Sequence, residues 1–231
     1  RTRRRTRRAT RGPPDAQDDH GQDEYGASTT LSLREGDLPV PDLAVGRLVE
    51  SAADMNAVLG AYLATSDGVM ATPASTLVTG YDFLTDSANA VAAELAAGTG
   101  PGAANSTLIT AADISPDDLR SWTADDLRRE LLGGGDDVVF LAGHFSANSA
   151  LAADYATSIL TTELASSDVD LTNSLIFSGG CHSGYNIVDG DAVPGVTLPL
   201  DWAEAFAAKG ATLVAGTGYQ YGDTDFLEYS E

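Results

Sequence analysis

The chain has 231 residues, 43% of them hydrophobic, and its 34 acidic residues against 13 basic ones leave a formal net charge of −21. This size and apolar content suit one domain with a real core. No apolar run approaches the ~20 residues that cross a bilayer, and so acidic a chain repels nucleic acid and anionic membranes. We therefore expect a protein with no membrane span and no nucleic-acid partner, adapted to high salt, where screening removes self-repulsion; the alternative is an ordinary acidic, alanine-rich protein.

Residues 1–30 differ in composition from the rest. Residues 1–12 hold seven arginines, and Gly12-Pro13-Pro14 and an Asp/Gln/Gly-rich stretch follow. The lack of large apolar side chains predicts a disordered tail over 1–30 and one domain over 31–231. No charged region followed by an apolar one marks a signal peptide. Since the chain does not begin with Met, removal of a leader stays open.

The ordered elements begin with an extended segment over 38–47, set by its prolines. Ser51 with Asp54 three residues on is a variant of the capping box and predicts a helix that runs to about residue 64. Beyond it, strands and helices alternate. The predicted strands are 75–79, 106–110, 138–141, 175–177 and 211–215, and the predicted helices are 86–97, 123–132, 150–164 and 201–209.

This alternation predicts an α/β fold with a mainly parallel sheet and helices on both faces. The strands are continuous apolar runs, as strands covered on both faces require. In such sheets ligands bind where the strands end at their carboxyl edge. The residues that follow each strand are therefore the first place to look for chemistry.

Two of these strand ends carry reactive side chains. Residues 138–141 lead to His144, and residues 175–177 lead to Cys181, the only cysteine in the chain. A thiol becomes a useful nucleophile as thiolate, and a nearby imidazole is a common means of forming it. We predict that His144 acts as base toward Cys181 and then protonates the leaving amine, while the backbone amides of Gly180 and Phe145 stabilise an oxyanion.

Competing interpretations exist for these residues. A lone cysteine is often a small buried hydrophobe, and a histidine at a strand end is often a surface residue. His182, adjacent to Cys181, points away from it on an extended chain and is expected at the rim. Residues 143–147, Gly-His-Phe-Ser-Ala, place a serine one position late for the nucleophile elbow of a serine hydrolase, which disfavours that class.

The chain resembles the gingipain-type cysteine peptidases of the caspase-like fold. The resemblance rests on Pro41-Asp-Leu-Ala-Val-Gly-Arg-Leu48, on the stretches that end at His144 and Cys181, and on Asp23-Glu-Tyr-Gly26. It covers most of residues 23–220. It implies a caspase-like three-layer sandwich and a cysteine endopeptidase whose Cys–His dyad hydrolyses peptide bonds through a thioester acyl-enzyme. It also favours an extracellular or cell-envelope location.

The chain departs from the family pattern at three points. Phe145 stands where the family usually has glycine, Gly180 where it commonly has alanine, and an arginine-rich stretch where it has a further N-terminal strand. The resemblance therefore implies that the first strand is missing, either because the chain is a piece of a longer protein or because its start is misassigned. Phe145 and this missing strand support the alternative function, an inactive caspase-like domain that serves as a binding module.

The specificity pocket and the cofactors are less defined. Asp189, Tyr219 and Tyr221 are candidates to line a pocket beside the nucleophile, with solvated surface or core packing as the alternative. Neither zinc nor dinucleotide motifs occur, and no calcium loop has the required spacing. We expect no metal site and no cofactor, with loosely bound calcium in salt as the remaining option. The expected partner is a polypeptide substrate; the sequence does not indicate an oligomeric state.

Overall fold

The computed structural model describes residues 27–33, 36–41, 46–65, 69–191 and 198–220, and the chain divides into two compact units, Arg1–Arg47 and Leu48–Glu231. The described part of the first unit is an antiparallel hairpin of β1 (Ala27–Leu33) and β2 (Gly36–Pro41). The predicted boundary at residue 30 thus falls inside β1. The predicted disorder of residues 1–26 lies outside the described residues.

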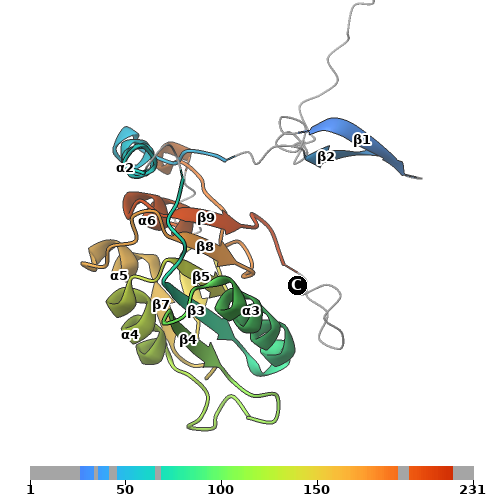
Figure 1. Cartoon of the computed structure of the whole chain (residues 1–231), viewed down its shortest axis with the longest axis vertical. Helices are drawn as coiled ribbons and strands as arrows, with labels where there is room; N and C mark the ends of the chain where they lie inside the picture. The colour runs from blue at the N-terminus through green and yellow to red at the C-terminus, as the bar shows by residue number, and fades with distance from the viewer. Residues whose placement is uncertain (1–26, 34–35, 42–45, 66–68, 192–197, 221–231) are drawn as a thin grey trace, which may run out of the picture. The chain divides into compact units, whose positions relative to one another are not determined.

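The second unit is built on a five-stranded parallel sheet, which confirms the α/β prediction (Figure 1). Its order is β4-β3-β5-β8-β9, and every neighbouring pair is parallel. The reversal of strand order beside β3 sends the crossovers to opposite faces of the sheet, because such crossovers are right-handed. The strands are β3 (Ser75–Gly80), β4 (Ala104–Ile109), β5 (Val138–Leu141), β8 (Leu175–Ser178) and β9 (Thr212–Ala215).

Helices flank both faces of this sheet, as predicted. On one side α3 (Thr85–Gly98) packs on β3 and β4. On the other side lie α4 (Ala124–Gly134), α5 (Thr161–Ser166) and α6 (Trp202–Ala208), and α2 (Ala52–Leu63) packs on α6 (Figure 1). No helix in the described ranges is long and apolar enough to cross a membrane.

The helix starts follow their capping residues. Ser51 and Asp54 form the predicted capping box of α2, and Thr123 and Asp126 form that of α4. The Asp201 carboxylate accepts the Glu204 N–H at the start of α6. Each such cap satisfies backbone donors that have no partner inside the helix, which stabilises the helix by about 1 kcal/mol.

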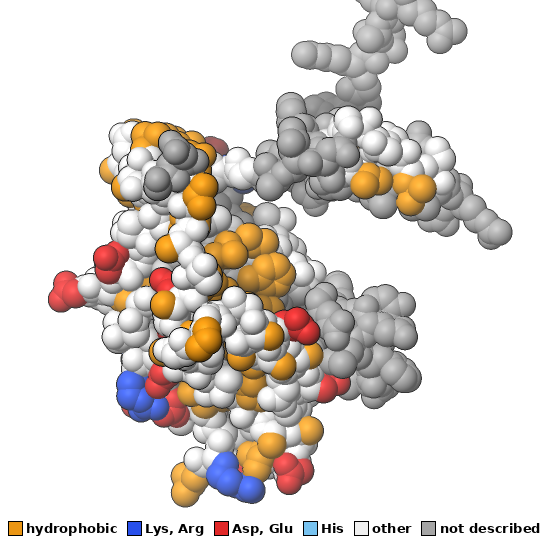
Figure 2. Space-filling model, in the orientation of Figure 1, with side chains coloured by type: hydrophobic (Ala, Val, Ile, Leu, Met, Phe, Trp, Pro, Cys, Tyr) orange, Lys and Arg blue, Asp and Glu red, His pale blue; other side chains and the backbone are white. Residues whose placement is uncertain are grey.

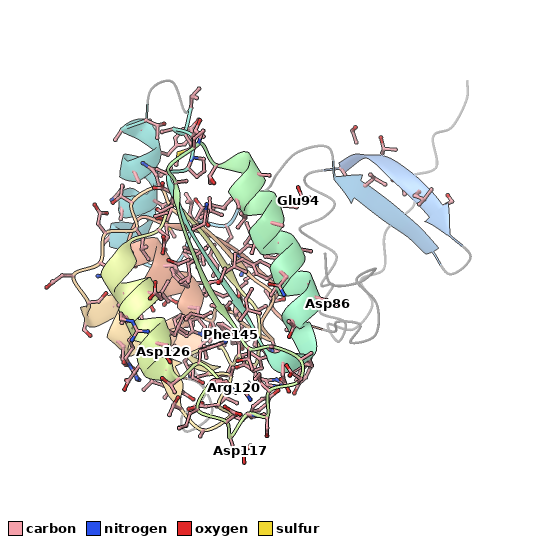
Figure 3. The ribbon with its side chains drawn as sticks, turned by 60° about the horizontal axis from the view of Figure 1, so that its bottom comes forward. Asp86, Glu94, Asp117, Arg120, Asp126 and Phe145 are labelled. Carbon is pink, nitrogen blue, oxygen red and sulfur yellow. The ribbon has the colours of Figure 1, made fainter. Side chains whose placement is uncertain are left out.

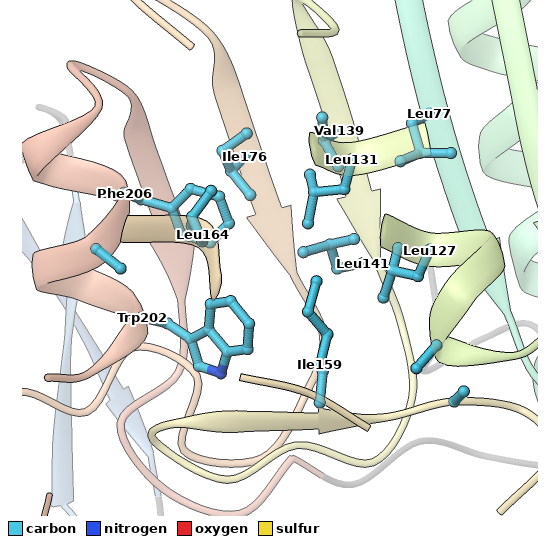
Figure 4. Close-up of a cluster of buried hydrophobic side chains, with 14 of the residues drawn as sticks. Leu77, Leu127, Leu131, Val139, Leu141, Ile159, Leu164, Ile176, Trp202 and Phe206 are labelled. Atoms are coloured by element: carbon cyan, nitrogen blue, oxygen red, sulfur yellow. The ribbon is translucent and has the colours of Figure 1, made fainter. Parts of the chain in front are cut away.

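The core lies between the sheet and the α4–α6 layer (Figure 4). The strands contribute Leu77, Val139 and Ile176, each fully buried. They meet helix side chains that include Leu131, Leu164, Trp202 and Phe206. Burying one such side chain stabilises the fold by roughly 1.5–3 kcal/mol, so this layer holds the ends of β5 and β8 in place.

The opposite face of β8 and β9 is not covered as the continuous apolar runs predict. Phe177 is 46% exposed, Leu175 is 42% exposed and Val214 is 45% exposed. The reason is that α3 packs on β3 and β4, so that none of the helices in the described ranges covers this face of β8. Figure 2 shows hydrophobic side chains gathered on the side of this unit that faces the viewer.

The predicted helix over 150–164 is wrong. The chain instead forms a hairpin of β6 (Ser149–Leu151) and β7 (Ser158–Leu160), and only residues 161–166 are helical. A tight turn causes this: the Asp154 carboxylate accepts the N–H groups of Ala156 and Thr157 at 3.0 and 2.9 Å, and Tyr155 takes φ 52°. An Asp that captures nearby amides favours a turn over a helix.

Candidate active site

The two predicted dyad residues follow neighbouring strands in the same register. Leu141 of β5 pairs with Ser178 of β8, and His144 and Cys181 each lie three residues beyond that pair. The Gly179 N–H donates to the Leu141 carbonyl at 2.8 Å, which continues the pairing one step past the strands. The register therefore places the histidine and the cysteine after neighbouring strands at the carboxyl edge of the sheet, where open α/β folds bind ligands.

Aromatic rings hold His144. Its exposed imidazole lies against Tyr81, Phe83 and Tyr155, with ring centroids 5.3, 5.4 and 5.5 Å away. These distances are typical of packed aromatic pairs. The imidazole is thus oriented by ring packing while its edge stays accessible to solvent.

Tyr81 is a supporting residue that the sequence prediction missed. It follows β3, is fully buried, and donates its hydroxyl to the Leu151 carbonyl. Gly143 adopts φ +147°, and a Cβ there would come within 2.4 Å of the Tyr81 ring, so only glycine fits. Burial raises the pKa of the Tyr81 phenol above its ordinary value. Its place after a strand at the same edge was the signal available in the sequence.

Backbone groups hold Cys181, whose side chain is partly exposed. The Gln220 N–H donates to the sulfur at 3.5 Å, and the thiol faces the Gln220 carbonyl oxygen at 3.7 Å. The segment 216–220, which follows β9, also accepts the N–H groups of His182 (by Gly218) and Gly184 (by Gly216) at 2.8 and 2.9 Å. The turn that contains Cys181 (residues 180–184, the Cys181 turn) is therefore hydrogen-bonded to this segment through main-chain atoms.

The amides predicted to stabilise an oxyanion belong to the residues next to His144 and Cys181, Phe145 and Gly180. The Gly180 N–H donates to the Ser178 hydroxyl at 3.2 Å, and the Gly180 carbonyl accepts the Ser183 hydroxyl at 2.7 Å. The Gly180 amide must therefore exchange one partner to serve an oxyanion. The Phe145 side chain is partly buried and packs against the core cluster.

The pocket candidates lie around the same turn. The His182 ring contacts the exposed Tyr219 ring at 4.6 Å, and its Nδ1 lies 3.1 Å from the Thr217 carbonyl oxygen. Asp189 begins a short 3-10 segment, η2 (Asp189–Asp191), in the loop after Cys181. Tyr221 lies outside the described residues. The structure thus places Tyr219 beside His182 and leaves the pocket itself a prediction.

A buried carboxylate that the sequence prediction did not single out anchors the same loop. Asp201 is 6% exposed, and its Oδ2 accepts the Asn186 side-chain amide at 2.9 Å. The same amide donates to Glu50 at 3.0 Å. Burial raises the pKa of Asp201 above its ordinary value, although its hydrogen bonds act in the opposite direction. Since this carboxylate already has donors, it holds the loop rather than awaiting a basic substrate.

Acidic residues elsewhere are mainly surface charges. Asp86 and Glu94 on α3 and Asp117 after β4 are exposed (Figure 3). Over the described ranges, no group of three or more His, Cys, Asp or Glu side chains could hold a metal ion. A hollow of about 900 Å³, which Met70, Asp137 and Leu175 help to line, lies at the opposite edge, where the strands begin. It is therefore separate from the His144–Cys181 edge.

Comparisons with known proteins do not extend this description. No protein-family model matches the chain, and neither a curated protein nor a solved structure does. Any function of the chain therefore rests on the geometry of its own residues.

Proposed function

We propose that the chain is a cysteine endopeptidase in which Cys181 is the nucleophile and His144 the general base. One observation carries the proposal: both residues lie three positions beyond the paired residues Leu141 and Ser178 of adjacent parallel strands. Residues at equal distance past paired positions start from neighbouring points of the sheet edge. Proton transfer requires a nucleophile and its base within hydrogen-bond reach, and start points on neighbouring strands allow such an approach.

The chemistry follows from these two side chains. His144 takes the thiol proton, and the Cys181 sulfur attacks the carbonyl carbon of the scissile peptide bond. The tetrahedral oxyanion is stabilised by backbone N–H groups. His144 then gives its proton to the leaving amine, which leaves a thioester on Cys181. A water molecule, deprotonated by His144, hydrolyses this thioester and frees the carboxyl product.

The family assignment is part of the proposal. A gingipain-type peptidase of the caspase-like fold agrees with the parallel sheet, with helices on both of its faces, and with the histidine and cysteine after adjacent strands. The expected substrate is a polypeptide, and the expected location is extracellular or in the cell envelope. Thiol–imidazole chemistry uses groups of the chain alone, which is why we propose no cofactor.

The test is labelling with a thiol-directed peptidyl electrophile in high and low salt, followed by mass spectrometry. We expect stoichiometric modification of Cys181, lost in Cys181→Ser and abolished by His144→Ala. The matched control is His182→Ala, which removes the neighbouring imidazole and should leave labelling in place. A folded protein whose thiol reacts no faster than free cysteine would overturn the proposal.

One observation favours the alternative, an inactive domain that binds a partner. The Gln220 backbone lies against the Cys181 sulfur, with its N–H nitrogen at 3.5 Å and its carbonyl oxygen at 3.7 Å. A substrate needs access to this sulfur. If the small reagent iodoacetamide labelled Cys181 and peptidyl electrophiles did not label it in any salt condition, the result would favour the binding module over the peptidase.

A further inference from the structure

We infer that Phe145 is a positioning residue whose side chain, seated against the α-carbon of Gly180, sets the spacing between the His144 loop and the Cys181 loop. The inference rests on the proposed function and adds a residue to its machinery. It gives a structural role to Phe145, which stands where the resembling family usually has glycine, because its side chain packs against the core cluster.

The contact between the two loops is close. A Cβ at Gly180 would lie 2.2 Å from Phe145 Cδ2, 2.3 Å from its Cγ and 2.6 Å from its Cβ. Such separations are far below a van der Waals contact, so the phenyl ring occupies the space that a side chain at position 180 would need. Phe145 directly follows His144, and Gly180 directly precedes Cys181. One contact thus joins the immediate neighbours of the two dyad residues.

The ring is fixed from its other side as well. It contacts the Trp202 ring, with centroids 6.0 Å apart, and Trp202 is 1% exposed. Trp202 is the first residue of α6, and its N–H donates to the Ala147 carbonyl at 2.9 Å. The Phe145 ring is therefore held between Gly180 and a buried indole, both of which are themselves anchored to the core layer.

The two loops need such a contact because the strand pairing ends before them. After Leu141 and Ser178 the ladder continues only through the Gly179 N–H, one residue short of Gly180. From that point the separation of the loops is set by side-chain packing. A phenyl ring packed against a bare α-carbon fixes the distance between the two loops. Gly180 has no side chain to rearrange, and the Phe145 ring cannot change its rotamer without losing the contact.

The pair also has the volume relation of a compensating exchange. A methyl group at position 180 must push the Phe145 side chain away, and the Phe145 Cβ, at 2.6 Å, is too close as well as the ring. The substitution Gly180→Ala should therefore harm the site alone and be tolerated together with Phe145→Gly, which removes the ring and the Cβ. Contacting residues that share a space show such non-additivity.

The experiment compares Gly180→Ala, Phe145→Gly, the double variant of these two substitutions, and Phe145→Leu, a conservative substitution that keeps an apolar side chain against Gly180. The control is Gly179→Ala, because a Cβ there meets only the Leu141 carbonyl oxygen at 4.0 Å. Thermal melts establish folding and give the coupling of the pair. The second-order rate of Cys181 labelling by the peptidyl electrophile, and the pH profile of its alkylation by iodoacetamide, report on the dyad.

We expect Gly180→Ala and Phe145→Gly each to slow peptidyl labelling by roughly tenfold to 100-fold, the cost of misplacing reacting groups by about 1 Å. Their pH profiles should move toward that of His144→Ala, and the double variant and Phe145→Leu should recover most of the rate. Folded single variants with wild-type rates and profiles would overturn the inference while the peptidase proposal stands. Absence of peptidyl labelling in the wild type overturns the peptidase proposal; in that case, additive melting shifts of the two single variants would overturn the contact's role as well.

Discussion

The two loops of the candidate site are held in different ways. Side chains hold the loop after β5: Tyr81 lies under Gly143, and the Phe145 ring packs against Trp202. The turn after β8 is held by main-chain atoms, because His182 and Gly184 donate their N–H groups to segment 216–220. Side-chain substitutions should therefore alter the loop after β5 directly, whereas the turn after β8 keeps its main-chain bonds to segment 216–220 in most single substitutions.

The strongest test of this comparison is Gly184→Ala. A Cβ at Gly184 would lie 2.5 Å from the carbonyl oxygen of Ala215 and 2.8 Å from its carbonyl carbon, both in the backbone of β9. These atoms cannot move without disturbing the pairing of β9 with β8. We expect a loss of about 3 kcal/mol in the free energy of unfolding, at the upper end of overpacking costs, measured by denaturant unfolding.

The matched control for this substitution is Gly218→Ala in the partner segment. A Cβ at Gly218 would have nothing within 4 Å. Its unfolding free energy should stay within about 0.5 kcal/mol of the wild type. Equal losses in the two variants would show that the clash at Gly184 is not what limits the turn.

Tyr81→Phe tests the side-chain-held loop with a smaller expected effect. The change removes the hydroxyl that donates to the Leu151 carbonyl and keeps the buried ring. Leaving this partly buried acceptor without its partner should cost about 1.5 kcal/mol. Denaturant unfolding measures the loss. Phe83→Tyr, which adds a hydroxyl to another of the three rings beside His144, serves as a comparison. An unchanged free energy of unfolding in Tyr81→Phe would contradict the role of the Tyr81 hydroxyl in supporting the loop after β5.

Ser183→Ala probes the Cys181 turn by removing the hydrogen bond that the buried Ser183 hydroxyl donates to the Gly180 carbonyl at 2.7 Å. Because the turn keeps its main-chain bonds to segment 216–220, we expect a loss of about 1 kcal/mol. Labelling of Cys181 by iodoacetamide should change less than twofold, since 1 kcal/mol in global stability leaves the native turn populated. A larger fall in labelling than Gly184→Ala produces would reverse the comparison.

The sequence was enough to predict the frame of the site. Apolar runs that lead to His144 and Cys181 predicted two strands of a parallel sheet, and the structure shows these strands, β5 and β8, to be neighbours. The helix predicted over 150–164 failed because one side chain, Asp154, captures two amides and turns the chain. Alanine-rich composition favours helix only where no such competing bond exists.

The support around the dyad was beyond such reasoning for a different cause. The contact of segment 216–220 with Cys181 consists of backbone atoms, which every residue type carries, so no pattern in the letters marks it. The fit of Phe145 to Gly180 depends on two positions far apart in the chain. Each is an unremarkable residue by itself, and only their meeting in space gives the pair its meaning.

Alkaline pH should distinguish the two loops by weakening the loop after β5 more than the Cys181 turn. Burial, and then the charge of Asp82, raises the pKa of Tyr155 to about 12 from its ordinary value of 10, and the pKa of Tyr81 is raised as well. A phenol whose folded-state pKa is raised contributes stability that is complete below pH 10 and is lost as the pH rises through 10 toward 12.

Both phenols lie beside His144, at the loop after β5. Urea unfolding measured from about pH 8 to about pH 12 should therefore show a shallower loss of stability in Tyr155→Phe than in the wild type. The control, Tyr219→Phe, alters the exposed ring beside His182 and should keep the wild-type slope; identical slopes in all three proteins would mean that ionisation of Tyr155 does not weaken the loop after β5.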